Sequence, residues 1–116
     1  MRYLHTERGL AHFDLKGDNL VLTIELCLSL IDFGMTERLD KKLKDRTKMT
    51  PKYRAPEIKK DLDYLGGPAD VFGVGVCLFM IMFQAAPFSG KFCLDDENYK
   101  HHFLAEEEAD LSFFDD

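Results

Sequence analysis

The stretch that decides the fold is residues 12–19, which read His12-Phe13-Asp14-Leu15-Lys16-Gly17-Asp18-Asn19. It is polar and turn-like, and two apolar runs at 20–24 and 26–31 follow it, each of which predicts a strand. Two strands joined by a turn would bring Asp32 back beside Asn19. A carboxylate and an amide oxygen that converge are hard ligands suited to Mg²⁺. This part of the sequence therefore predicts a small β-hairpin that carries a magnesium site.

Asp14 and Lys16 lie two residues apart in the same loop. On an extended backbone, two such side chains can face a common target. The carboxylate of Asp14 would accept a proton from a hydroxyl, and the ammonium of Lys16 would neutralise a phosphate. This pair predicts chemistry on a phosphate ester or anhydride.

Upstream, residues 1–7 predict the last turns of a helix, which Gly9 would end. Downstream, residues 38–60 carry ten Lys or Arg against three acidic residues and show no clear periodicity. Pro51 and Pro56 oppose a continuous helix there. We interpret this run as a solvated loop rather than a nucleic-acid-binding patch.

The most apolar stretch, residues 71–83, contains no charged residue. A membrane-spanning helix needs about 20 apolar residues, so we expect a buried central helix over 70–84. Residues 66–68, Gly-Gly-Pro, predict a turn before it, and Asp70 would open the helix. Asp95 to Glu108 predicts a further helix, since acidic residues in its first turn suit the helix dipole.

The chain has 116 residues and a net charge of −6, which allows one domain and argues against a dedicated nucleic-acid binder. We expect Cys27, Cys77 and Cys93 to be buried, reduced thiols, because each lies in or beside apolar sequence. No secretory signal begins the chain, and His101-His102 lacks a third metal ligand of suitable spacing. We therefore expect a cytoplasmic protein without a membrane segment.

The motifs, taken in order, resemble those of the eukaryotic protein kinases. Residues 12–19 are similar to the catalytic loop H-R-D-L-K-x-x-N, residues 32–34 match D-F-G, and residues 55–57 match A-P-E. Residues 50–54 resemble the substrate-facing segment before A-P-E, and residues 70–75 resemble the start of the central helix of the family. The lysine at position 16 is more similar to serine/threonine kinases than to tyrosine kinases.

The resemblance implies roles for individual residues. Asp14 would accept the proton of the substrate hydroxyl, and Lys16 would stabilise the transferring γ-phosphate. Asn19 and Asp32 would hold Mg²⁺ on the ATP phosphates. Further residues would shape the substrate segment or support the fold: Thr50, Lys52, Tyr53 and Arg54 in the segment, and His12, Phe33, Glu57 and Asp70 as structural residues. Thr50 would act through its hydroxyl, Glu57 would pair with a later arginine, and Asp70 would accept backbone hydrogen bonds from the catalytic loop.

The resemblance also implies a fold class. We expect an α+β chain, the mostly helical larger, C-terminal lobe of a protein kinase with a small β-hairpin. Residues 1–116 would be a partial kinase domain with an activation segment at 32–57, lacking the N-terminal lobe and the final helices. Phe13 replaces the arginine that in many kinases binds an activation-loop phosphate, so we expect no strong dependence on phosphorylation at Thr47.

We therefore expect a fragment of a serine/threonine protein kinase that uses ATP and Mg²⁺, acts on a protein substrate and is inactive as an isolated chain. The alternative is a non-catalytic, kinase-like binding module, which would work through its basic loop and acidic tail. We expect neither a nucleic-acid nor a membrane partner, and the sequence carries no signal for an oligomeric state.

Overall fold

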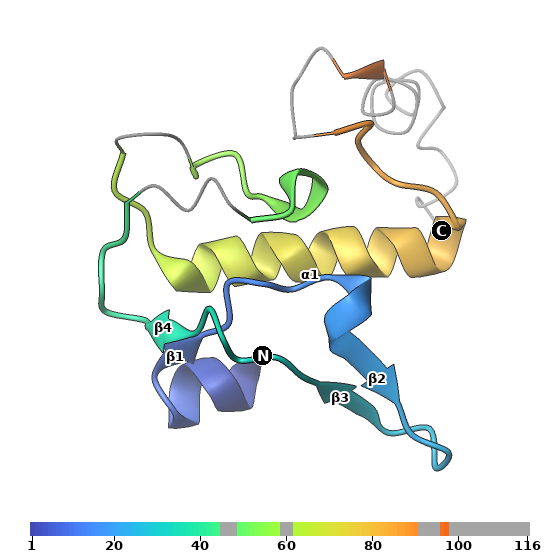
Figure 1. Cartoon of the computed structure of the whole chain (residues 1–116), viewed down its shortest axis with the longest axis horizontal. Coiled ribbons are helices and arrows are strands. Elements are labelled where there is room, and N and C mark those ends of the chain that lie inside the picture. The colour runs from blue at the N-terminus through green and yellow to red at the C-terminus, as the bar shows by residue number, and fades with distance from the viewer. Residues whose placement is uncertain (45–48, 59–61, 91–95, 98–116) are drawn as a thin grey trace, which may run out of the picture.

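The computed structural model describes residues 1–44, 49–58, 62–90 and 96–97 (Figure 1). The predicted helix at 95–108, except for residues 96 and 97, lies outside these residues, as do Cys93, the pair at 101–102 and Thr47. The elements in chain order are a π-helical turn η1 (Tyr3–Glu7), β1 (Leu10–Ala11), a 3₁₀ turn η2 (Gly17–Asn19), β2 (Leu20–Leu22), β3 (Leu28–Leu30), β4 (Glu37–Arg38), a 3₁₀ turn η3 (Pro51–Tyr53) and α1 (Gly66–Phe83). Helix and strand are mixed, as in an α+β fold. Within the described residues, however, only α1 is an α-helix, so a mostly helical composition is not seen there.

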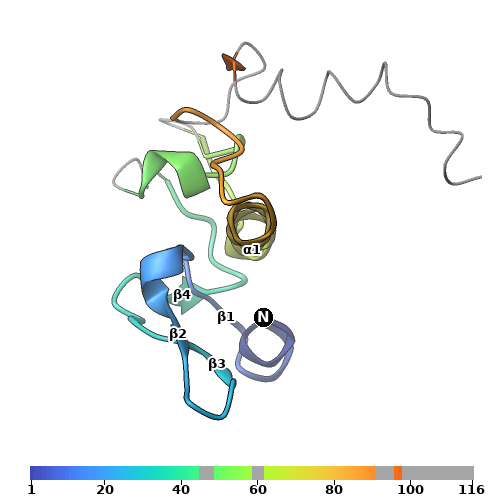
Figure 2. The same cartoon turned by 90° about the vertical axis from the view of Figure 1, so that its right-hand side faces the viewer.

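Helix α1 lies across the middle of the described residues, with β1 and η3 packed against it and the β2–β3 hairpin pointing away from it (Figures 1 and 2). It begins at Gly66, so the prediction of a turn at 66–68 and a helix start at 70 was wrong. Pro68 is compatible with a first helical turn because the N–H groups there have no partner within the helix. Gln84, with φ 53°, ends the helix and donates its N–H to the carbonyl of Met80.

One stripe of α1 is buried, and the opposite face is exposed. The buried residues are Gly66, Ala69, Asp70, Gly73, Val76 and Cys77. Val71, Leu78, Ile81 and Met82 are each more than half exposed. The expectation of a wholly buried central helix was thus half right. By length and composition the helix could also cross a membrane, but its buried stripe packs on the loop at 12–17, as a core helix does.

The strands form two separate two-stranded antiparallel sheets. In one, β1 pairs with β4, with Leu10 opposite Arg38. In the other, β2 pairs with β3, with Leu20 opposite Leu30. This second pair is the predicted hairpin, shorter than expected because residues 23–27 form its turn. There the Thr23 N–H bonds the Cys27 carbonyl at 2.9 Å.

Two buried clusters hold these elements together. The larger joins β1 and the loop after it to the segments around Leu43, Ala55 and Tyr64 and to the start of α1. The smaller packs Tyr53 on Val76, Cys77 and Phe88. Residues 49–58 are therefore attached to the start and to the middle of α1 by side-chain packing.

Of the two described cysteines, only Cys77 is buried. Cys27 is exposed, so the prediction of a buried thiol there was wrong. It lies at the hairpin turn, where Ile24 is 94% and Leu26 is 78% exposed. An apolar neighbourhood in sequence did not predict burial because the turn projects away from α1 (Figure 1).

Candidate active site

The loop at 12–19 is held against α1 by a buried carboxylate. Asp70, 1% exposed, accepts the backbone N–H of His12 at 2.7 Å and that of Phe13 at 2.8 Å. His5 of η1 contacts the same carboxylate through Nε2 at 2.9 Å. Hydrogen bonds to a buried charge are stronger than neutral ones, so Asp70 sets the position of the loop relative to the helix. The contribution of His5 was not expected from the sequence.

Phe13 has an unusual backbone conformation that its side chain helps to keep. Its φ is 65°, a region that non-glycine residues rarely adopt. The ring is fully buried and packs edge-on against Tyr64, with ring centroids 6.0 Å apart. It also lies against Gly66, where an added Cβ would come within 2.3 Å of the ring. The packing of this ring and the bond to Asp70 together hold the loop in its turn.

Asp14, Lys16 and Asn19 contact one another directly. Lys16 Nζ lies 3.3 Å from Asp14 Oδ2. Asn19 Nδ2 donates to the same oxygen at 3.0 Å and to the Asp14 carbonyl at 2.7 Å. Because both amide hydrogens of Asn19 point to Asp14, its Oδ1 is the atom left to bind a cation. The structure thus brings together three of the four polar residues predicted from the sequence.

His12 connects this loop to residues 31–34. Its Nδ1 accepts the Asp14 N–H at 3.2 Å, and its Nε2 lies 3.0 Å from the Ile31 carbonyl. A carbonyl can only accept, so His12 is the neutral tautomer with its hydrogen on Nε2. Its ring also meets that of Phe33 edge-on, at a centroid distance of 5.1 Å. His12 is therefore a buried residue whose ring connects the loop at 12–19 to residues 31–34.

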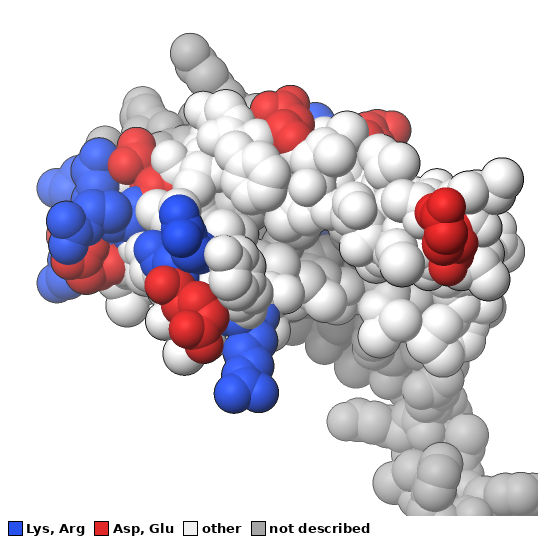
Figure 3. Space-filling view, turned by 90° about the horizontal axis from the view of Figure 1, so that it is seen from below, with Lys and Arg blue, Asp and Glu red and all other residues white. Residues whose placement is uncertain are grey.

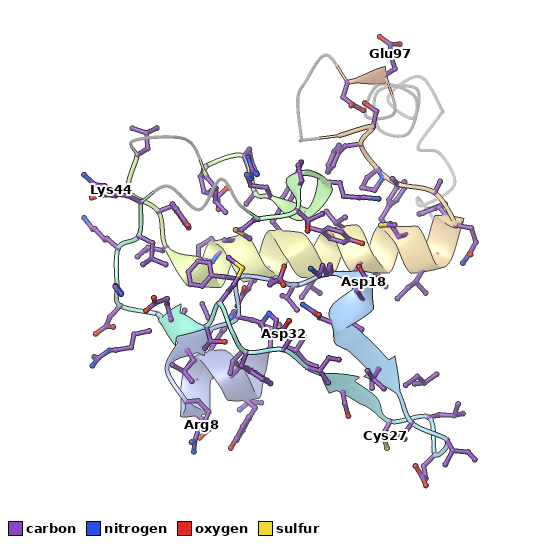
Figure 4. The ribbon with its side chains drawn as sticks, viewed as in Figure 1. Arg8, Asp18, Cys27, Asp32, Lys44 and Glu97 are labelled. Carbon is purple, nitrogen blue, oxygen red and sulfur yellow. The ribbon has the colours of Figure 1, made fainter. Side chains whose placement is uncertain are left out.

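Asp32, the fourth predicted residue, is exposed and lies below α1 in Figure 4, between β1 and β3. Its neighbour Ile31 donates its N–H to the Asn19 carbonyl at 2.9 Å. Asp32 has φ 59°, and its Oδ1 accepts the Gly34 N–H at 3.2 Å. No cluster of three His, Cys, Asp or Glu side chains occurs in the described ranges. An amide oxygen and one carboxylate nonetheless fit Mg²⁺, which keeps several waters when bound.

The segment at 50–57 packs on α1 and reaches the loop at 12–19 through Tyr53. Thr50 precedes η3, and its side chain makes no capping hydrogen bond to that turn. Tyr53 and Arg54 are buried, and Arg54 Nη2 donates to the Met49 carbonyl at 2.7 Å. Lys52 is half-buried, and Glu57 is exposed. Tyr53 and Arg54 are among the residues expected to shape the substrate segment. Because both are buried, their main contribution is to packing in the core.

Tyr53 forms a contact that the sequence did not predict. Its hydroxyl accepts the Gly17 N–H at 3.5 Å and donates to the Met80 sulfur at 3.5 Å. Cys77 lies one helical turn before Met80, and burial raises the pKa of its thiol. These residues come from η2, η3 and α1, so no local pattern could have revealed them.

Charged side chains gather at the β4 end of the molecule (Figure 3). Arg38 pairs with Asp40 at 2.6 Å, Lys41 with Glu37 at 3.0 Å and Lys44 with Asp63 at 3.5 Å. The hydrogen bond from Arg38 lowers the pKa of the Asp40 carboxyl. These pairs lie at the surface, as the interpretation of the basic run as a solvated loop expects, but Met49, Tyr53 and Arg54 of the same run are buried, so the run as a whole is not a solvated loop. The rest of the face in Figure 3 is mostly uncharged.

Comparisons with known proteins agree with these motifs. The family model of the protein kinase domain matches residues 1–111. The CBL-interacting serine/threonine-protein kinase 5 of Arabidopsis thaliana is 35% identical over 115 residues, which cover 96% of this chain and 24% of that protein. The maternal embryonic leucine zipper kinase of Xenopus laevis is 37% identical over 100 residues, which cover 83% of this chain and 14% of that protein. The chain thus spans about a quarter or less of the length of these relatives.

Proposed function

The chain belongs to the protein kinase family, and on that premise we propose that it forms the catalytic-loop part of a serine/threonine protein kinase. It would correspond to the larger, C-terminal lobe, with residues 12–19 as catalytic loop, 32–34 as metal-binding motif and 32–57 as activation segment. The observation that carries this proposal is the direct contact between Asp14, Lys16 and Asn19. A binding module without chemistry has no need of this arrangement.

In the proposed reaction the residues have separate tasks. Asp14 accepts the proton of a serine or threonine hydroxyl and orients its oxygen toward the γ-phosphate. Lys16, held 3.3 Å from Asp14, offsets the negative charge that the transferring group carries. Asn19 and Asp32 would hold Mg²⁺ through Oδ1 and the carboxylate, and the metal would neutralise charge on the ATP phosphates. Asp70 and His12 position these groups.

We also propose that residues 1–116 alone do not transfer phosphate at a measurable rate, because phosphoryl transfer depends on positioning ATP from several sides. The relatives that the chain resembles are at least about four times longer. We therefore expect no measurable change in melting temperature when Mg·ATP is added to the chain. A clear increase would show that the chain holds the nucleotide by itself.

The metal site can be tested without catalysis. Mn²⁺ replaces Mg²⁺ and broadens the NMR signals of nearby nuclei, which reveals binding too weak to change the melting temperature. We expect the amide signals of residues 19 and 31–34 to broaden first, and Asp32→Asn to reduce this effect. Asp63→Asn, at an exposed residue paired with Lys44, is the matched control. Uniform broadening across the chain would contradict the assignment.

The chemistry can be tested in a chimera, in which residues 1–111 replace the matching segment of the Xenopus laevis kinase. We expect transfer of phosphate to serine and threonine peptides but not to tyrosine peptides. Asp14→Asn should abolish it, and Asp63→Asn should leave it unchanged. Equal activity of the Asp14→Asn chimera would sink the assignment of Asp14. A folded chimera without activity would instead favour the alternative, a non-catalytic, kinase-like binding module.

A protein substrate, ATP and Mg²⁺ follow from the family, and neither a nucleic-acid nor a membrane partner is proposed. A reducing, cytoplasmic location is supported by Cys27 and Cys77, both of which are free thiols. Fractionation of cells with an antibody to the protein tests this location.

A further inference from the structure

A hollow open to solvent lies where the chain enters β1 and where it leaves β4. Five residues line it: Arg8, Gly9, Arg38, Leu39 and Asp40. The Leu39 N–H donates to the Gly9 carbonyl at 2.9 Å, so the antiparallel register that pairs Leu10 with Arg38 continues outward. By that register Arg8 lies across from Asp40 and diagonal to Arg38. Two arginines and one carboxylate therefore gather at the end of this ribbon.

The hollow lies on the solvent side of the β1–β4 ribbon. In the next pair of the register Ala11 lies opposite Glu37, and Ala11 is fully buried in the cluster that contains Phe13. Neighbouring residues of a strand point to opposite faces, so the side chain of Arg38 points away from that cluster. Arg8 lies on the side of the ribbon that faces away from α1 (Figure 4). The hollow is therefore separate from position 13, where many kinases have an arginine that binds an activation-loop phosphate.

The two arginines differ in what they already bind. Arg38 donates to the Asp40 carboxylate from Nε at 2.9 Å and from Nη2 at 2.6 Å. The side chain of Arg8 forms no ion pair or hydrogen bond with any residue that the structure describes. A guanidinium group has five N–H donors, so Arg8 keeps all of its donors and Arg38 keeps those of Nη1. Asp40 thus holds one arginine in place beside another that is free to bind.

A phosphate monoester fits these donors better than a carboxylate does. At neutral pH it carries a charge of about −1.5 to −2 and has three acceptor oxygens. Two oxygens would accept the paired N–H groups of Arg8, and the third would accept from Nη1 of Arg38. A carboxylate has two oxygens, which Arg8 alone would occupy. The arrangement therefore favours a phosphoryl group over an acidic side chain.

The surroundings favour a single phosphoryl group over a polyanion. Lys41 and Lys44, which follow Arg38 in the chain, are already paired with Glu37 and Asp63. An anionic membrane or a nucleic acid is bound by several unpaired basic side chains at once. One phosphorylated side chain needs only the two arginines of the hollow.

We propose that the hollow between Arg8 and Arg38 binds a phosphorylated serine or threonine of a protein partner. This inference does not rest on the proposed function, because it uses neither the catalytic loop nor the metal-binding motif. It assigns the chain a second surface, one that recruits a protein already phosphorylated elsewhere.

The test uses the 116-residue chain, labelled with ¹⁵N, at low salt, where exposed charges are least screened. The probes are three glycine-rich peptides that differ only in the central residue, which is phosphoserine, glutamate or serine. We expect the phosphoserine peptide to shift the amide signals of residues 8–10 and 37–40. The glutamate peptide should bind about fivefold more weakly, since it loses one exposed charged contact. The serine peptide should cause no shift.

Substitutions at exposed positions locate the site. Arg8→Gln should weaken binding of the phosphoserine peptide about fivefold. Arg2→Gln is the matched control, because Arg2 is also exposed but does not line the hollow. Asp40→Asn should strengthen binding, because Arg38 gains free donors and a nearby negative charge is removed. Asp63→Asn removes a carboxylate that does not line the hollow and should leave the affinity unchanged.

Three results would overturn the proposal. Equal binding of the phosphoserine and glutamate peptides would show that the hollow does not select a phosphoryl group. Equal effects of Arg8→Gln and Arg2→Gln, or shifts confined to residues 14–19, would place binding elsewhere on the chain. Phosphatidylserine vesicles that shift residues 8–10 and 37–40 when the phosphoserine peptide does not would show that these side chains recognise a membrane surface instead.

Discussion

Asp70 on α1 accepts the backbone N–H of Phe13 at 2.8 Å, although the two residues lie 57 positions apart in the sequence. The bond holds Phe13 at φ 65°, and this conformation turns the chain so that Asp14 follows at the surface of the loop. The buried carboxylate thus controls the backbone from which the proposed catalytic residues project.

Asp70→Asn should destabilise the chain by about 3 kcal/mol. Asparagine has one acceptor oxygen instead of two, so one buried N–H group would lose its acceptor and the other would keep only a neutral acceptor. Urea denaturation followed by circular dichroism measures the change. Asp63→Asn makes the same substitution at an exposed residue, and we expect it to change stability by less than about 0.5 kcal/mol. Equal effects of the two substitutions would show that Asp70 does not hold the loop.

Phe13→Ala should cost about 3–5 kcal/mol of stability, because the ring is fully buried and its removal leaves a cavity between Ala11, Tyr64 and α1. Phe83→Ala removes a ring that is 55% exposed and serves as the control, with a much smaller loss. Denaturation curves of both variants give the comparison. A loss below about 1 kcal/mol for Phe13→Ala would mean that the ring does not anchor the loop.

Two glycines of the same helix should respond to alanine in opposite directions. A Cβ at Gly66 would come within 2.3 Å of Phe13 and 2.4 Å of the Ala11 side chain, whereas at Gly75 it would meet nothing within 4 Å. Gly66→Ala should therefore destabilise the chain by at least about 1–3 kcal/mol. Gly75→Ala should stabilise it by about 0.5–1 kcal/mol, since alanine loses less entropy in a helix. Melting temperatures that move in the same direction would contradict this packing.

Deprotonation of the Cys77 thiol should contribute to a lower free energy of unfolding at alkaline pH. Burial raises the pKa of its thiol above the ordinary value of 9.0, so the folded chain holds this proton more tightly than the unfolded chain. The resulting stabilisation is fully present below pH 9 and is lost as the pH rises through the raised pKa. Unfolding free energies measured on both sides of pH 9 should fall less steeply for Cys77→Ala than for the wild type. Cys27→Ala, at the exposed thiol, should follow the wild type, and parallel behaviour of Cys77→Ala would contradict the argument.

Local sequence predicted the hairpin, the polar loop and the apolar helix, because each depends on residues close together in the chain. It did not predict the start of α1, since Gly66-Gly67-Pro68 is typical of a turn. The first helical turn forms there because Gly66 is the residue that can lie against the buried ring of Phe13. Cys27 was also predicted wrongly, because an apolar neighbourhood says nothing about whether another element covers it.

The sequence by itself determined the types of residue at the site and the order of their motifs, because a carboxylate, a lysine and an amide within one short loop must lie close together. Only the tertiary structure decided how this loop is held and what lies beside it. Gly17 meets Tyr53 across 36 positions, and Tyr53 meets Met80 across 27. Contacts over such separations depend on how helix and loops pack in three dimensions, and periodicity within one segment carries no information about them.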